Sequence, residues 1–158
     1  MSADIRFNNE NCSFGLRTVG ILFNGDKVLL QREKDGYACA LPGGTVKFGE
    51  TTEETLIREW KEETDTDIKV KRLIWTEENF WEWNGQKQHG IAFYYLVDFL
   101  GDSSIPETEE FISGRDNCNV VLGWMPLDEI KNITLYPKSA KTELLSLCDD
   151  TKHFISKE

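Results

Sequence analysis

The chain has 158 residues, of which 39% are hydrophobic and 29% are charged, and its formal net charge is −10. Its length and composition predict one folded domain over residues 1–158 and exclude a disordered or low-complexity chain. The negative charge argues against binding to polymeric nucleic acid, which needs clustered Lys and Arg to displace counterions. An anionic ligand would therefore need a cation as an intermediary.

The amino-terminal stretch MSADIRFNNENCS has no basic start and no apolar core, and no run of about 18 apolar residues occurs. The sequence therefore predicts neither a secretory signal nor a membrane span, and we expect a cytoplasmic protein. Cys12, Cys39, Cys118 and Cys148 lie far apart, without the paired spacing of a zinc site or a small disulfide scaffold. We expect four reduced thiols.

The first regular structure predicted along the chain is a β-hairpin. Apolar stretches flank Asn24-Gly25-Asp26 within residues 16–33, and such residues tolerate the positive φ of a tight turn. A loop with a Pro-Gly-Gly run follows, and then the spacing becomes helical. Thr51 is suited to cap the helix together with Glu54, three residues later, and the helix should run to about Thr64.

A helical wheel divides this helix into two sides. The side predicted to be buried comprises Leu56, Ile57, Trp60 and Thr64. The acidic side chains predicted to project from its flank are those of Glu59, Glu62 and Glu63.

The rest of the chain alternates strands with less regular segments. Strands are predicted over residues 67–78 and 88–100, with a hairpin connection around Asn84-Gly85. Residues 101–119 form a long polar loop, and loops of this length are more often functional than idle. A short strand and a carboxy-terminal helix over residues 137–150 complete the order. We expect an α/β (α+β) fold with a mixed central β-sheet between helices.

The acidic flank is the feature that carries chemistry. Glu59, Glu62 and Glu63 are neighbours on one helix surface, where three ionised groups repel one another. Mg²⁺ or Mn²⁺ would offset that repulsion, because such cations take carboxylate oxygens and add phosphate oxygens and water. Gly43 and Gly44 allow the preceding backbone to approach closely. The alternative is an ordinary solvated acidic helix face supported by weak ion pairs.

The segment from Gly44 to Thr66 resembles the Nudix box, in which Gly, five residues, Glu, seven residues, Arg-Glu, a bulky apolar residue, any residue and Glu-Glu follow one another. The matching positions are Gly44, Glu50, Arg58, Glu59, Trp60, Glu62 and Glu63. Two positions depart from the pattern, because Asp65 stands where the family has Gly and Thr66 where it has an apolar residue. We expect a slightly less stable helix end and no loss of metal binding.

The resemblance implies a Nudix α/β/α sandwich and a role for each matching residue. Glu59, Glu62 and Glu63 would ligate the divalent metal, with the carbonyl of Gly43 or Gly44. Arg58 would orient Glu59, and Glu50 would support the junction of loop and helix. Glu59, Arg58 and Glu62 are thus the catalytic candidates. The general base would be Glu59 or a glutamate of the long loop, for which the candidates are Glu107, Glu109 and Glu110.

Four residues outside the box are candidates for substrate binding. Arg17 and Arg32 lie on early strands and could meet phosphates, and the alternative is surface ion pairing. Trp81 lies in an aromatic, polar segment where it could stack on a nucleobase, and the alternative is core or dimer packing. Tyr37 precedes the metal loop, and only its position supports a role in the substrate pocket.

The function implied is that of a MutT-like Nudix hydrolase, which uses Mg²⁺ or Mn²⁺ to cleave a pyrophosphate bond in a nucleoside diphosphate linked to another group. Nucleoside triphosphates, ADP-ribose, nucleotide sugars and capped RNA 5′ ends all remain open as substrates, and the acidity of the chain disfavours the last. A catalytically silent Nudix-like module that binds a nucleotide or regulates a partner is the alternative. Such a module would be expected to have lost a metal-ligand glutamate, and all three are present. The resemblance is also compatible with a homodimer.

Overall fold

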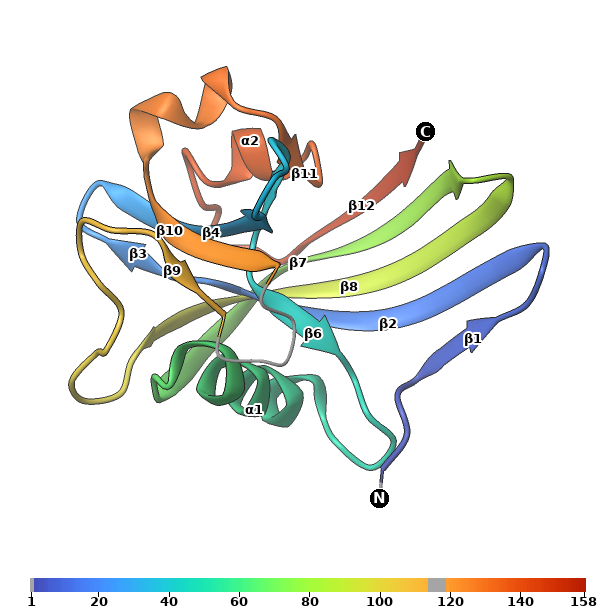
Figure 1. Cartoon of the computed structure of the whole chain (residues 1–158), viewed down its shortest axis with the longest axis horizontal. Coiled ribbons are helices and arrows are strands. Elements are labelled where there is room, and N and C mark those ends of the chain that lie inside the picture. Colours follow the sequence, from blue (N-terminus) through green and yellow to red (C-terminus); the bar gives the residue numbers. More distant parts are fainter. Residues whose placement is uncertain (1, 114–118) are drawn as a thin grey trace.

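A computed structural model describes residues 2–113 and 119–158 of the chain, and it places two mixed β-sheets between helical layers (Figure 1). In the first sheet the strand order is β1-β2-β8-β7-β12, and β6 also pairs with β2. Its strands are β1 Arg6–Asn8, β2 Cys12–Ile21, β6 Gly43–Thr45, β7 Ile68–Trp83, β8 Gln86–Phe99 and β12 Lys152–Lys157. Strand β2 runs parallel to β8, whereas β7 and β8 form an antiparallel hairpin.

The second sheet has the order β11-β5-β4-β10-β9, with β3 paired to β4. Its strands are β3 Phe23–Asn24, β4 Lys27–Glu33, β5 Cys39–Ala40, β9 Phe111–Ile112, β10 Val120–Pro126 and β11 Leu135–Tyr136. The predicted turn at Asn24-Gly25-Asp26 is present, but it joins β3 to β4, because the chain leaves the first sheet after Ile21. The turn at Asn84-Gly85 is confirmed, with both residues at positive φ.

Helix α1, Thr52–Thr64, covers one side of the sheets. It buries Leu56 and Trp60 completely, together with residues of both sheets such as Leu29 and Tyr95. The predicted buried side of the helix is confirmed for Leu56, Trp60 and Thr64 but is wrong for Ile57, which is 43% exposed. Ile57 follows Leu56 by one residue, about 100° around the helix, and it lies beyond the surface that the sheets cover.

The opposite side is covered by the 3₁₀-helix η1, Leu127–Asn132, and by helix α2, Ala140–Glu143 (Figure 1). Ile130 and Leu144 pack there against a second core cluster that includes Trp75 and Tyr94. The α/β/α layering and the mixed sheet are thus confirmed. The predicted helix over residues 137–150 is wrong in extent, because its helical part is confined to α2 and the chain ends in strand β12.

The described residues also bear on the predictions about membrane spans and cysteines. Within residues 2–113 and 119–158, no helix has the length and apolarity required to cross a bilayer. In the same part of the chain Cys12, Cys39 and Cys148 are free thiols, in agreement with the prediction. The prediction for Cys118 lies outside the described residues.

Helix α1 reaches β2 through Gly20. A Cβ atom built on Gly20 would lie 2.7 Å from the indole nitrogen of Trp60, a distance that real side chains do not show. We expect Gly20→Ala to lower the free energy of unfolding by roughly 1–3 kcal/mol, as overpacking does elsewhere. Gly15→Ala on the same strand is the matched control, because nothing lies within 4 Å of a Cβ there. Denaturant unfolding of both variants measures the difference, and equal losses would contradict the assigned contact.

Candidate active site

Helix α1 begins with the predicted capping arrangement. The backbone N–H of Glu54 donates to the Thr51 hydroxyl at 3.1 Å, and the backbone N–H of Thr51 donates to the Glu54 carboxylate at 2.8 Å. Both bonds satisfy amide groups that have no acceptor within the helix. The cap therefore sets the position at which the helix starts and, with it, the direction in which each later glutamate points.

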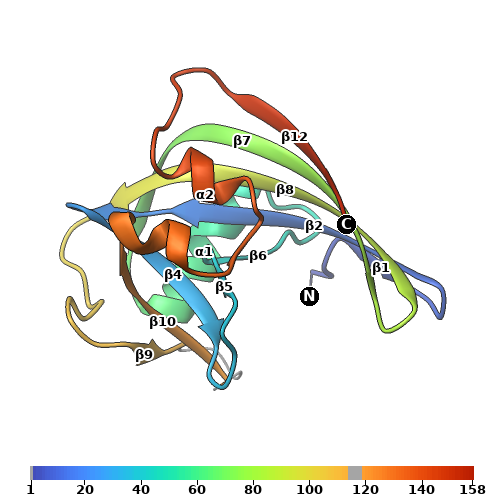
Figure 2. The same cartoon turned by 90° about the horizontal axis from the view of Figure 1, so that it is seen from above.

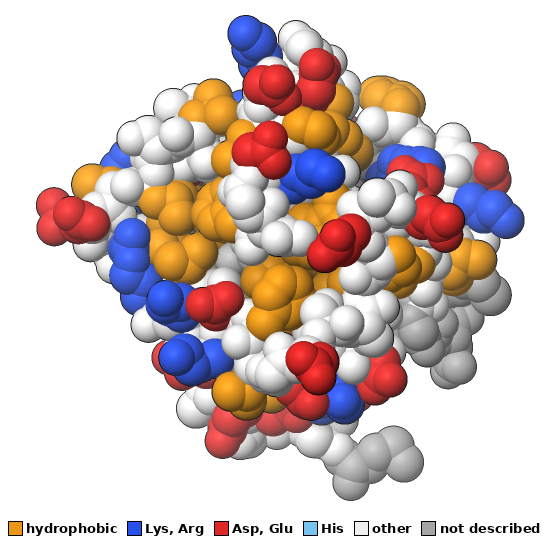
Figure 3. Space-filling model, turned by 90° about the vertical axis from the view of Figure 1, so that its left-hand side faces the viewer, with side chains coloured by type: hydrophobic (Ala, Val, Ile, Leu, Met, Phe, Trp, Pro, Cys, Tyr) orange, Lys and Arg blue, Asp and Glu red, His pale blue; other side chains and the backbone are white. Residues whose placement is uncertain are grey.

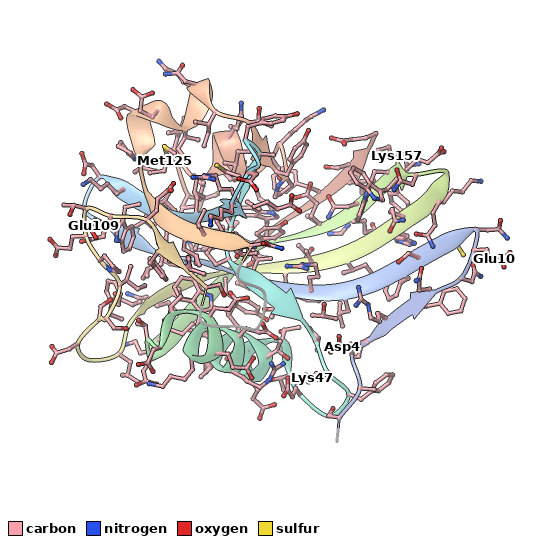
Figure 4. The ribbon with its side chains drawn as sticks, in the orientation of Figure 1. Asp4, Glu10, Lys47, Glu109, Met125 and Lys157 are labelled. Carbon is pink, nitrogen blue, oxygen red and sulfur yellow. The ribbon has the colours of Figure 1, made fainter. Side chains whose placement is uncertain are left out.

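The loop before this helix is held by the amino-terminal segment, which sequence reasoning did not anticipate. The backbone N–H of Ile5 donates to the carbonyl of Val46 at 2.7 Å, and that of Phe48 donates to the carbonyl of Ala3 at 2.8 Å. Asp4 and Lys47 form a bridge between these two stretches, and Figure 4 shows both at the base of the molecule. Nothing in the local pattern of either segment signals this pairing, because it joins positions more than 40 residues apart.

Gly43 and Gly44 are enclosed on opposite sides of β6. A Cβ at Gly43 would overlap the backbone of Thr18 and Val19, and a Cβ at Gly44 would overlap the side chain of Glu59. Two glycines are therefore required at these positions for α1, β6 and β2 to pack as they do. The Glu59 carboxylate lies directly against the backbone of Gly44.

The three glutamates of the motif differ in burial. Glu59 is 2% exposed and Glu63 is 8% exposed, whereas the Glu62 side chain is 41% exposed. The prediction that all three project from the flank is therefore wrong for Glu59 and Glu63. These two belong to the face of α1 that packs on the rest of the molecule, and a buried carboxylate is stable only where charged or polar groups compensate it.

Arg58 supplies such compensation. Its guanidinium donates to both oxygens of Glu50, at 2.9 Å each, and to Glu59 Oε1 at 2.8 Å. A weaker contact, at 3.4 Å, joins it to Glu62. The rigid fork of donors in a guanidinium suits this bidentate pairing. Arg58 thus connects the start of the helix to the buried glutamate.

Glu50 is held as a carboxylate by its hydrogen-bond partners. Hydrogen bonds from Arg58 and from the hydroxyl of Thr55 hold the pKa of Glu50 at about 2, well below its usual range. Thr55 is buried and donates at 2.7 Å. Sequence reasoning did not identify Thr55 as part of the site. Thr55 lies one helical turn after the N-cap residue Thr51, on the side of the helix that faces Glu50, and a helical wheel would show this position.

The chemistry of these donors fits a hard divalent cation. Carboxylate oxygens of Glu59, Glu62 and Glu63 and a carbonyl of the Gly43-Gly44 pair are the ligands that Mg²⁺ and Mn²⁺ prefer. Within residues 2–113 and 119–158, no three acidic, His or Cys side chains already converge as a metal-binding group.

Arg32 lies in a separate cluster with the loop glutamates. Its guanidinium donates to Glu110 at 2.7 Å and to the carbonyl of Lys34 at 2.8 Å. A cavity of about 370 Å³ is lined by Arg32 together with Glu107, Glu109, Glu110, Cys39, Trp124 and Met125. Figure 4 shows Glu109 and Met125 on this side of the molecule, and Figure 3 shows hydrophobic side chains gathered there between acidic and basic ones.

The other predicted substrate-binding residues lie elsewhere. Arg17 and Trp81 share the face of the first sheet that is opposite to α1, because Arg17 on β2 pairs with Ala92 on β8, and Trp81 occupies that same face of β7. Tyr37, 83% exposed, lies in the connection between β4 and β5. The candidates thus form two groups, one around Arg32 and one around Arg17, while Tyr37 stands alone.

Comparison with known proteins agrees with this arrangement. A family model described as the NUDIX domain matches residues 14–144, which is most of the chain. The chain belongs to the Nudix family. The matched segment includes the whole Nudix box, every strand of the second sheet and the cavity around Arg32, and in the first sheet it leaves out β1, β12 and the first two residues of β2.

Two curated relatives align with different shares of this chain. An uncharacterized Nudix hydrolase of Bacillus subtilis is 31% identical over 124 residues, which are 74% of this chain and 69% of that protein. A protein of Methanocaldococcus jannaschii named ADP-ribose pyrophosphatase is 38% identical over 85 residues, 52% of this chain. The match spans only about half the length of that protein, 49%.

Solved structures support the Nudix fold. A MutT protein from Bacillus halodurans has a TM-score of 0.66 at 23% identity, with 89% of this chain and 90% of that chain covered. A Streptococcus suis structure described as an ADP-ribose pyrophosphatase has a TM-score of 0.58 at 21% identity, with 89% and 98% covered. At such identities the similarity establishes the fold alone.

The lowered pKa of Glu50 predicts a pH-dependent contribution to stability in this Nudix protein. A carboxyl with a lower pKa in the folded state stabilises the fold above its unfolded pKa, and the effect is lost as pH falls through the folded value. We expect Glu50→Gln to cost on the order of 2–3 kcal/mol near neutral pH and progressively less between about pH 5 and pH 2. Denaturant unfolding across that range tests this, with Glu53→Gln as the control. A cost that does not change with pH would contradict the pairing with Arg58.

Asp65 replaces the glycine of the Nudix box at the end of α1. It adopts the left-handed conformation with φ 51°, and its backbone N–H donates to the carbonyl of Lys61 at 3.0 Å. Its side chain forms an ion pair with Lys61, which also pairs with Asp67, and such contacts contribute little at the surface. We expect Asp65→Gly to raise the free energy of unfolding by about 0.5–1 kcal/mol, because glycine adopts this conformation without strain. A lower thermal midpoint in that variant would show that the ion pair outweighs the strain.

Proposed function

We propose that this protein is a divalent-metal-dependent hydrolase that cleaves a pyrophosphate bond in a nucleoside diphosphate linked to another group. Candidate substrates are nucleoside triphosphates, ADP-ribose and nucleotide sugars. The observation that carries the proposal is the Glu59 carboxylate, buried against Gly44 and tied through Arg58 to Glu50. Family membership and the relatives named for ADP-ribose pyrophosphatase activity make ADP-ribose the first substrate to test.

In this proposal Glu59, Glu62 and Glu63, with the carbonyl of Gly43 or Gly44, hold Mg²⁺ or Mn²⁺. Such a cation activates water and neutralises the charge that develops on phosphoryl oxygens. Arg58 acts as a positioning residue, because its contacts with Glu50 and Glu59 fix the direction of the Glu59 carboxylate.

The acceptor for the proton of the attacking water is either Glu59 or a loop glutamate. Glu110 is the loop candidate with the most defined position, because Arg32 holds it at 2.7 Å. Glu107 and Glu109 line the same cavity. The Arg32–Glu110 pair would also keep the Arg32 guanidinium close to an incoming phosphate.

The proposal also covers the size of the substrate, the cellular location, the domain organisation and the oligomeric state. A small nucleotide can bind to an acidic chain when a cation lies between its phosphates and the carboxylates. A polymeric nucleic acid would need clustered Lys and Arg along its backbone, so we do not propose it as a substrate. We also propose a cytoplasmic location, one domain over residues 1–158 and a homodimer. Sedimentation of the purified protein measures the last of these.

A catalytically silent nucleotide-binding module is the other function to distinguish. It predicts binding of nucleotides without turnover. Retention of all three box glutamates favours the hydrolase, because a silent module would be expected to have lost a metal-ligand glutamate.

Glutamine substitutions test the metal-binding glutamates. We expect Glu62→Gln and Glu63→Gln each to lower turnover of a nucleotide panel with Mg²⁺ by at least about 100-fold, because even groups that only support a metal ligand cost about 10- to 100-fold. Mn²⁺ binding to each variant, measured by calorimetry without substrate, should weaken in parallel.

Glu53→Gln is the matched control, since Glu53 is an exposed acid of the same helix and lies outside the proposed ligand set. Its turnover and Mn²⁺ affinity should equal those of the wild type. Absence of phosphate-bond cleavage across the panel, or cleavage undiminished in both box variants, would refute the hydrolase. Mass analysis of the products also identifies the phosphorus that is attacked.

A further inference from the structure

One face of the first sheet carries a group of residues that the chemistry above does not use. This face is opposite to α1, and the half nearer to β1 lies clear of α2 and η1 (Figure 2). Pairing across the strands places Arg6, Gly15, Gly90 and Asn79 in one row. The next row contains Thr45, Arg17, Ala92 and Glu77. We refer to Arg6, Gly15, Arg17, Trp81 and Gly90 as the glycine patch.

The centre of the glycine patch has no side chain above the backbone. Nothing lies within 4 Å of a Cβ built on Gly15. A Cβ on the adjacent Gly90 would lie 3.6 Å from the ring of Trp81, so the indole extends over Gly90 and stops short of Gly15. Trp81 remains 40% exposed. A flat ring placed over Gly15 would therefore rest on the peptide backbone and contact the indole beside it.

The charge of the glycine patch is opposite to that of the chain. Arg6 and Arg17 are exposed, and neither forms an ion pair within the described part of the chain. The acid in the same rows, Glu77, is fully buried and accepts hydrogen bonds from Trp75, Ser139 and Ser156, so its charge is compensated internally. Two unpaired arginines on a chain with a formal net charge of −10 mark a place suited to an anion.

The glycine patch also adjoins the Nudix box. Arg17 pairs directly with Thr45, the residue after Gly44. Gly15 lies two residues further along β2, a distance of roughly 7 Å. A phosphate near Arg17 and a base over Gly15 are thus separated by about the length of one nucleotide.

We propose that the glycine patch binds the nucleobase end of the substrate. A planar heteroaromatic ring lies over Gly15 against Trp81, and the Arg17 guanidinium contacts the phosphate next to the nucleoside. This inference rests on the proposed function, because it assigns a place to one part of the same substrate. It makes Gly15 and Trp81 specificity-determining residues that favour a base over a sugar or an alkyl group.

Binding measurements without metal separate this inference from turnover. The probes are AMP, GMP, CMP and UMP, each compared with ribose 5-phosphate, which has the phosphate and the sugar but no base. We expect the wild type to bind at least one nucleotide about tenfold or more tightly than ribose 5-phosphate, as base–aromatic contacts typically provide. Equal affinity for all five probes would overturn the inference.

Substitutions locate the binding. Gly15→Leu places a side chain in open space and should weaken the preferred nucleotide by about tenfold or more, leaving ribose 5-phosphate unchanged. Trp81→Ala should have the same selective effect, whereas Arg17→Gln should weaken both probes. Gly15→Ala, a smaller obstruction, should give an intermediate loss and guards against misfolding of the leucine variant. Unchanged nucleotide affinity in Gly15→Leu and Trp81→Ala would overturn the inference.

Phe7→Ala is the matched control, because Phe7 is an exposed aromatic residue of β1 on the opposite face from Arg6. Its nucleotide affinity should equal that of the wild type. Sedimentation of Gly15→Leu excludes a rival role for the surface, since loss of a dimer with unchanged nucleotide affinity would assign the patch to a subunit contact. A wild type that binds nucleotides selectively but cleaves none would refute the proposed hydrolase and leave this inference standing.

Discussion

The close approach of α1 to strands β2 and β6 is the constraint on which the rest of the structure depends. Three glycines make it possible, because Gly20 faces the indole of Trp60, Gly43 faces the backbone of β2, and Gly44 faces the Glu59 side chain. A side chain at Gly20 or Gly44 would push the helix away from the sheet, and one at Gly43 would push β6 away from β2. The same contacts bury Trp60 in the core and hold the Glu59 carboxylate against the loop backbone, so one packing requirement serves both the stability of the fold and the geometry of the site.

Burial of the Glu59 carboxylate at this contact carries a desolvation cost, and nearby donors compensate it. Arg58 lies between Glu50 and Glu59 and contacts both, and Thr55 adds a hydrogen bond to Glu50. The pKa of Glu50 falls to about 2 as a result. In the proposed function, a divalent cation would offset repulsion among the glutamates of α1, and this would link an acidic helix to metal-dependent phosphate chemistry.

The first sheet separates two chemical environments. Its face towards α1 carries Gly44 and meets the acidic helix, whereas its other face presents Arg17, Trp81 and the half-buried backbone of Gly15 and Gly90. Because side chains alternate along a strand, Arg17 and Thr18 point to opposite faces although they are neighbours. In the proposed function, a nucleotide that reaches both environments would meet the carboxylates proposed to hold a cation at its phosphates and an aromatic surface at its base. This division follows from strand alternation and requires no separate domain.

Local chemistry made much of this protein predictable from sequence. The N-cap at Thr51, the extent of α1, the turns at Asn24-Gly25-Asp26 and Asn84-Gly85, and the relation of Gly44 to Glu59 each depend on residues close together in the chain. Tertiary structure alone decided which residues distant in sequence meet. It buried Glu59 and Glu63, exposed Ile57, paired the amino-terminal segment with the box loop, and shortened a predicted carboxy-terminal helix to the single turn of α2. Helical periodicity states which residues share a face, but burial depends on what covers that face, and this is determined by contacts across the whole chain.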